Sequence, residues 1–240
     1  MSIKPAHTNQ RGFSLIELLI AMVVTLVVMT ISVTLLARSL HIRTRENERS
    51  DEVADVQRAM NIMSREISNA GFNLNGNGIV ANDSNATAIR VRANLNKFNS
   101  AFSTGAQNGI GVVDEDAGED VTFFVNDAEN TNYLARWDPL QPSGPGLPEM
   151  RKTVLANRID GCRFYYFDQK VTYTQDPQNC RITNPTQAEV GDRTKAKFVV
   201  IVACVNTNEV GVPGEPGYQP PAQILLVSDV ALRNSNLTKY

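Results

Sequence analysis

The strongest pattern in the chain is a long apolar run near its beginning. Residues 13–37 contain a single charged side chain, that of Glu17. A helix over this range would rise about 37 Å, which is enough to cross a hydrocarbon layer of roughly 30 Å with some tilt. The pattern therefore predicts a membrane-spanning helix over residues 13–37.

A second pattern follows the apolar run and continues the helix. Residues 41–52 are mostly charged, with both signs and no apolar face, which is typical of a solvated helical stretch. Apolar residues then recur at spacings of three and four, which predicts an amphipathic helix that ends near Gly71. These residues are Val53, Val56, Met60, Met63, Ile67 and Ala70. No proline interrupts residues 14–70, so one unbroken helix of about 85 Å is expected.

From residue 72 onward, short runs of β-branched and alternating residues are separated by Gly, Pro, Asn and Asp. The residues 198–205 are continuously apolar, which predicts a central strand. We expect one antiparallel sheet that covers the apolar stripe of the helix, and hence an α+β fold. A coiled-coil dimer is the alternative cover for the stripe. The expected strands are residues 88–93, 121–125, 133–137, 163–168, 197–205 and 223–230.

Glu17 is the candidate functional residue of the apolar segment. A carboxylate inside a membrane helix is unfavourable by about 2.5–3.5 kcal/mol at mid-helix and by less near an end, so it usually marks a functional pairing. Cleavage between Gly12 and Phe13 would create a partner, because the new α-amine of Phe13 would be mostly protonated at neutral pH. That site lies before the apolar core, unlike the site of an ordinary secretory signal, so the anchor would survive processing.

Residues 12–22 (GFSLIELLIAM) resemble the class III signal of type IV prepilins and type II secretion pseudopilins. In those proteins a membrane aspartyl prepilin peptidase cuts after the glycine and N-methylates the new N-terminal phenylalanine. The resemblance implies that Gly12 is the cleavage residue and that Phe13 is the methylated N-terminus. It also implies that Glu17 engages the amine of a neighbouring subunit during filament assembly.

The resemblance implies a pilin-like lollipop in which a long helix packs on an antiparallel β-sheet head. Residues 1–12 would be the leader peptide, and residues 13–37 the transmembrane and filament-core helix. Residues 38–70 would be a periplasmic amphipathic helix, and residues 71–240 the β-rich head.

Topology cannot be decided from charge, because basic residues lie on both sides of the apolar run. The resemblance places residues 1–12 in the cytoplasm and the head in the periplasm. The protein is then a single-pass inner-membrane protein before assembly and part of a surface pilus afterwards.

Three further segments refine the resemblance. Thr34 stands where many major pilins carry a helix-breaking proline, which favours a minor pilin or a pseudopilin. Residues 63–72 (MSREISNAGF) and 230–234 (VALRN) are similar to PilW-like minor pilins and J-type pseudopilins. The implied function is to prime or support type IV pilus assembly at the filament tip, with prepilin peptidase and other minor and major pilins as partners. A J-type pseudopilin of type II secretion and a tip-displayed adhesion subunit are the alternatives.

Composition argues against an enzyme and against nucleic-acid binding. Removal of residues 1–12 leaves His41 as the one histidine, so neither a Ser-His-Asp triad nor a multi-histidine metal site can form in the head. The mature chain would carry 21 basic side chains (23 minus Lys4 and Arg11) against 25 acidic ones, which gives no electrostatic footprint for nucleic acid. We expect no cofactor.

The three cysteines allow three pairings in an oxidising periplasm. We favour Cys162 with Cys180, because Cys180 lies in a polar loop and Cys204 in the expected buried strand. Their spacing does not fit a zinc site.

Acidic residues cluster around Gly118 but lack the EF-hand pattern for calcium, so we expect a solvated loop and no metal. They are Asp114, Glu115, Asp116, Glu119 and Asp120.

Overall fold

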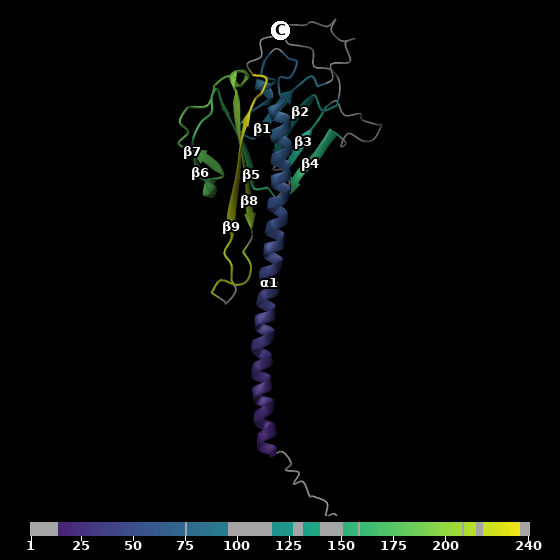
Figure 1. Ribbon diagram of the computed structural model, residues 1–240, viewed down its shortest axis with the longest axis vertical. Coiled ribbons are helices and arrows are strands. Elements are labelled where there is room, and N and C mark those ends of the chain that lie inside the picture. Colours follow the sequence, from purple (N-terminus) through teal and green to yellow (C-terminus); the bar gives the residue numbers. More distant parts are fainter. Residues whose placement is uncertain are drawn as a thin grey trace, which may run out of the picture.

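The computed structural model describes residues 14–74, 76–95, 117–126, 132–139, 151–157, 159–207, 209–214 and 218–235. One helix, α1 (Leu15–Ser68), runs along the length of the molecule, and the strands gather around its C-terminal half (Figure 1). The predicted α+β fold, a long N-terminal helix followed by an antiparallel β head, is confirmed.

Helix α1 is continuous, as the absence of proline predicted. Its amphipathic half buries the expected stripe: Val56, Met63 and Ile67 are fully inaccessible, and Met60 is nearly so. These side chains contact β4, β8 and β9 of the same chain, so the chain's own sheets cover the stripe. The alternative of a coiled-coil dimer is not needed for this burial.

The first sheet is a four-stranded antiparallel meander in the order β1-β2-β3-β4. Its strands are β1 (Ala88–Arg92), β2 (Asp120–Asn126), β3 (Tyr133–Trp137) and β4 (Lys152–Asn157). The first three were predicted from alternation and β-branched content. The fourth was missed because its buried residues, Leu155 and Ala156, are adjacent instead of alternating.

The second sheet is antiparallel, with β8 (Phe198–Thr207) between β5 (Gly161–Phe167) and β9 (Ala222–Ala231). A hairpin of β6 (Thr174–Asp176) and β7 (Arg181–Thr183) is not hydrogen-bonded to this sheet but packs on it through Ile182. Short 3-10 turns occupy Ala81–Asp83, Pro177–Asn179 and Arg193–Lys195. Because the head contains two larger sheets, the expectation of one sheet was wrong. The apolar stripe of α1 shares one core with residues of both larger sheets, which hydropathy along the chain cannot reveal.

Strand β8 is central, as its continuous apolar run predicted. Its odd-numbered residues, including Val199 and Ile201, face α1, whereas Val200 and Val202 belong to a second core on the opposite face. Both faces are buried, so the strand shows no polar alternation.

The C-terminal end of α1 is fixed by contacts that are distant in sequence. Asn234 Nδ2 donates hydrogen bonds to the carbonyls of Asn69 (3.2 Å) and Ala70 (3.1 Å), and the backbone N–H of Arg233 donates to Ser68 (3.2 Å). Carbonyls at a helix end have no partner within the helix, so Asn234 provides a partner for that of Ala70 and a second one for that of Asn69, which also accepts from the backbone N–H of Phe72.

Gly71, the predicted end of the helix, has a φ of +77° and donates its N–H to Arg92 O at 2.9 Å. Gly78, with a φ of +76°, packs directly against it, since a Cβ there would lie 2.1 Å from Gly71 N. Only glycine fits so close an approach of two backbones.

The disulfide joins Cys180 to Cys204, with 5.7 Å between the Cα atoms, and Cys162 is a buried free thiol. The predicted Cys162–Cys180 pair is therefore wrong. Cys162 lies in the core that faces α1, whereas Gly161 is the register partner of Cys204 on the other face of the sheet. Cys180 packs over Gly161, where a Cβ would meet its sulfur at 3.2 Å. Strand alternation thus places Cys204, not Cys162, opposite Cys180.

This pairing gives the first prediction. A non-reducing digest should contain one peptide pair linked through Cys180 and Cys204, and Cys162 should resist alkylation in the folded protein at pH 8, because burial raises the pKa of its thiol to about 12. Cys180→Ser should lower the free energy of unfolding by about 3 kcal/mol, since the bond closes a long loop. Cys162→Ser is the control for disulfide mapping. A linked Cys162 peptide would contradict the assignment.

Candidate assembly site

Glu17 lies in the first turn of α1. Its Oε2 accepts a hydrogen bond from the backbone N–H of Ser14 at 3.4 Å, and Ser14 O accepts from the backbone of Glu17 and Leu18. Amides at a helix N-terminus lack intrahelical partners and carry partial positive charge, so a carboxylate is stable there. Gly12 and Phe13 lie outside the described residues.

The apolar half of α1 has no cover from the rest of the chain. Every residue from Ser14 to Thr44 is exposed, and Leu15 and Leu26 expose 82 % and 68 % of their surface. This helix is long and apolar enough to cross a membrane by length and composition. So large an exposed apolar surface needs lipid or other helices around it.

Hydroxyl side chains within the apolar half are satisfied internally. Thr25, Thr30, Ser32 and Thr34 each donate to the carbonyl four residues earlier, at 2.6–3.0 Å. Such bonds remove the penalty of a free hydroxyl in an apolar environment. Glu17 is therefore the one ionisable side chain that this segment brings into such surroundings.

Arg45 is the only buried residue between Ser14 and Asp55. Its guanidinium donates to the Gln219 side chain and, at 2.6 Å, to Pro220 O. Gln219 in turn pairs with Val210 in the connection between β8 and β9. The contact ties this connection, which reaches down beside α1 in Figure 1, to the stalk. The charged run at residues 41–52 predicts a solvated position for Arg45, which is wrong, and no pattern in the sequence singles this residue out.

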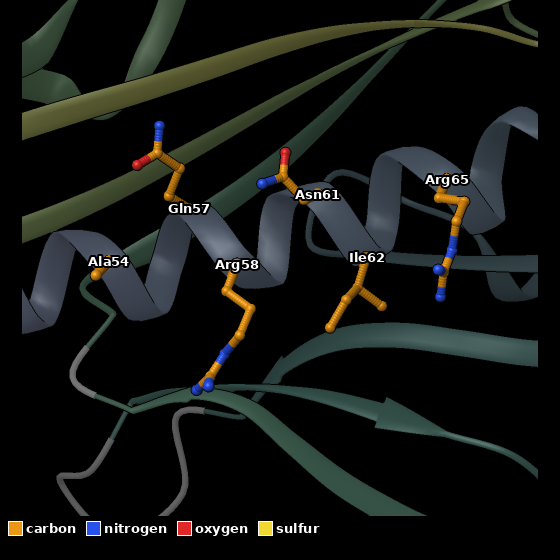
Figure 2. A pocket seen from close by; sticks show the side chains of 6 residues that line it. All are labelled: Ala54, Gln57, Arg58, Asn61, Ile62 and Arg65. Carbon is orange, nitrogen blue, oxygen red and sulfur yellow. The ribbon is translucent and has the colours of Figure 1, made fainter.

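A shallow groove lies on the side of α1 that faces away from the core (Figure 2). Arg58 and Arg65 extend from the same side of the helix, and Ile62 lies between them at the edge of the core. The groove is lined by Ala54, Gln57, Arg58, Asn61, Ile62 and Arg65, with no acidic residue among them.

The acidic cluster differs from expectation where it is described. Glu119 and Asp120 are buried, not solvated. Glu119 Oε1 accepts from Leu95 N at 2.7 Å, and Asp120 accepts from Arg90 and Arg92 at 2.7 and 3.0 Å. The hydrogen bond to Asp120 raises the pKa of Arg90. These two carboxylates therefore serve the fold. Residues 114–116 lie outside the described residues.

In the described part of the chain, no group of three or more His, Cys, Asp or Glu side chains is placed to hold a metal ion. His41 is exposed on the stalk. The features with unusual chemistry therefore lie along α1: a carboxylate at the start of an apolar surface, and a basic groove on the stalk.

Comparison with known families matches residues 7–33 to the prokaryotic N-terminal methylation motif. The match includes Gly12, Phe13 and Glu17, and it shows that the chain carries a type IV pilin-like prepilin signal. Such a motif implies processing by prepilin peptidase and assembly with other pilins, and with the apolar helix it indicates membrane anchoring. Signal and fold together support a type IV pilin or pseudopilin. A comparison with curated proteins found no match.

Arg45 provides a second prediction. Arg45→Ala should release the connection between β8 and β9, because a hydrogen bond from a charged group contributes about 1.5–3 kcal/mol. The amide N–H groups of Val210 and Gln219 each donate to the carbonyl of the other residue, at 3.1 and 2.9 Å, and their hydrogen exchange should become at least about tenfold faster. Arg43→Ala, at an exposed position two residues away, is the control. Unchanged protection in Arg45→Ala would show that the contact does not hold the connection.

Proposed function

We propose that this chain is a minor pilin of the PilW-like kind, which primes or supports type IV pilus assembly at the filament tip. Prepilin peptidase cleaves between Gly12 and Phe13 and methylates Phe13. The chain is then a single-pass inner-membrane protein with its head in the periplasm until assembly carries it to the cell surface.

The observation that carries the proposal is Glu17. It is the one charged side chain on an exposed apolar helix, and it lies four positions beyond the N-terminus that cleavage would create. In the described structure the only hydrogen bond to its carboxylate is the long one from the backbone N–H of Ser14, which leaves most of the acceptor capacity of that carboxylate unused. An α-amine from a neighbouring subunit can fill that capacity.

The pairing enforces axial register. When apolar helices pack against one another, either charge left alone would lie in a low-dielectric environment, at a cost of several kcal/mol. An incoming subunit is therefore stable at the depth where its Glu17 meets the amine of its neighbour. The apolar contacts supply the packing energy, and the charge pair selects the depth.

The finer assignment rests on two segments that meet in space. Residues 63–72 and 230–234 carry the resemblance to PilW-like minor pilins, and Asn234 caps the end of α1 within the first segment. The two segments that carry the resemblance are therefore in contact in the folded chain. Thr34, within an unbroken helix, also favours a minor pilin over a major one.

The proposal includes no enzymatic activity and no cofactor. Filament assembly needs exposed apolar surface and a charge pair, and α1 carries both the apolar surface and the carboxylate of that pair, Glu17. A J-type pseudopilin would use the same helix in the same way. The two functions are therefore distinguished by whether the type IV pilus or the type II secretion system requires the gene.

Glu17 gives the third prediction. Glu17→Ala should be cleaved by prepilin peptidase as the wild type is, because the cleavage residues are unchanged. Its incorporation into sheared pili should fall at least about tenfold, since several kcal/mol of pairing are lost. Glu17→Gln should fall similarly, because the amide keeps the shape but not the charge. Both are measured by immunoblot of sheared filaments and membranes.

Thr30→Ala is the matched control, because the Thr30 hydroxyl bonds only within its own helix, at 2.8 Å. It should assemble as the wild type does. Normal incorporation of the Glu17→Ala variant into pili would contradict the proposed mechanism. A defect in type II secretion with normal piliation, on deletion of the gene, would favour the pseudopilin.

A further inference from the structure

The outer face of the stalk carries two arginines and an asparagine in a regular spacing. Arg58, Asn61 and Arg65 lie at positions i, i+3 and i+7, which places them on one face of α1. All three are exposed and line the groove of Figure 2. Arg65 has no ion-pair partner among the described residues, so its charge is available to another chain.

A flanking face of the same helix carries acidic side chains in the same spacing. Glu48, Asp51 and Asp55 also lie at i, i+3 and i+7. Glu48 and Asp51 are exposed and make no ion pair within the described residues. Asp55 accepts a hydrogen bond from Arg58 at 2.9 Å, which shows that the acidic and basic faces adjoin.

The two faces match when parallel copies of the helix are displaced by ten residues, or about 15 Å. Glu48 of one copy is then level with Arg58 of the other, Asp51 with Asn61, and Asp55 with Arg65. A displacement of seven residues instead brings only one acidic residue, Asp51, level with an arginine, Arg58, and places Glu48 beside Asp55. Charge complementarity thus selects the ten-residue displacement.

We propose that the groove formed by Ala54, Gln57, Arg58, Asn61, Ile62 and Arg65 binds the acidic face of a second copy of this chain, parallel to the first and displaced by about 15 Å. The inference rests on the proposed function, because membrane insertion is what makes the two stalks parallel. It adds a contact outside the apolar segment, where solvent is present and where charge sets the register.

The displacement can be tested by cross-linking the full-length chain in membranes. Asp51→Cys and Asn61→Cys are expressed together with different tags and oxidised. We expect a disulfide between the two variants, because residues 51 and 61 are level, and no dimer when either variant is expressed alone. The buried Cys162 and the Cys180–Cys204 disulfide leave no accessible competing thiol. Asp51→Cys with Ala54→Cys is the control, because residue 54 lines the same groove but would not be level with residue 51.

The role of charge is tested in the same assay. Arg58→Glu in the Asn61→Cys chain should lower the cross-linked fraction by about two- to fivefold, the range expected of an exposed ion pair. Adding Glu48→Arg to the Asp51→Cys chain should restore it. High salt should weaken the wild-type contact but not the peptidase reaction.

The outcomes separate this inference from the function on which it rests. A mixed dimer that the charge reversal weakens and the double reversal restores supports the groove. No mixed dimer in chains that are processed and incorporated into pili overturns the contact and leaves the minor pilin standing. Dimers of single variants in equal yield also overturn it. Absence of peptidase processing, read from the mass of the same samples, overturns the proposed function instead.

Discussion

The whole structure depends on one helix whose two apolar surfaces need two different environments. Helix α1 is unbroken, so its two halves cannot adjust separately to membrane and head. The second half is covered by the two sheets, which bury Val56, Met63 and Ile67. The first half has no cover within the chain and requires lipid or other helices. A subunit of this design is complete only when it is anchored in a membrane or assembled in a filament.

The head is attached to this helix at three levels. Asn234 and the Gly71–Gly78 contact fix the top of the helix. Arg136 pairs with Glu66 at 3.0 Å at the level of the first sheet. Arg45 ties the connection between β8 and β9 to the stalk. A force on the apolar half would therefore move the helix and the head together as one body. This suits a subunit that is pulled out of a membrane during assembly.

Local patterns predicted much of this architecture. The apolar run, the stripe that begins at Val53 and the absence of proline predicted α1, and β-branched runs predicted six of the strands. The division into two sheets was not predictable, because strand pairing is a non-local property. The same limit explains the wrong disulfide: polarity placed Cys180 and Cys204 apart, whereas the register of Gly161 with Cys204 brings them together. Arg45 was missed because its partners lie 174–175 residues away.

Intact mass spectrometry shows whether this chain is processed as a prepilin. The protein is recovered from membranes and from sheared filaments, with and without prepilin peptidase. We expect a chain that begins at Phe13 and carries one added methyl group, only when the peptidase is present. A chain that keeps residues 1–12 in cells with active peptidase would contradict this expectation, and the filament mechanism would have to be abandoned.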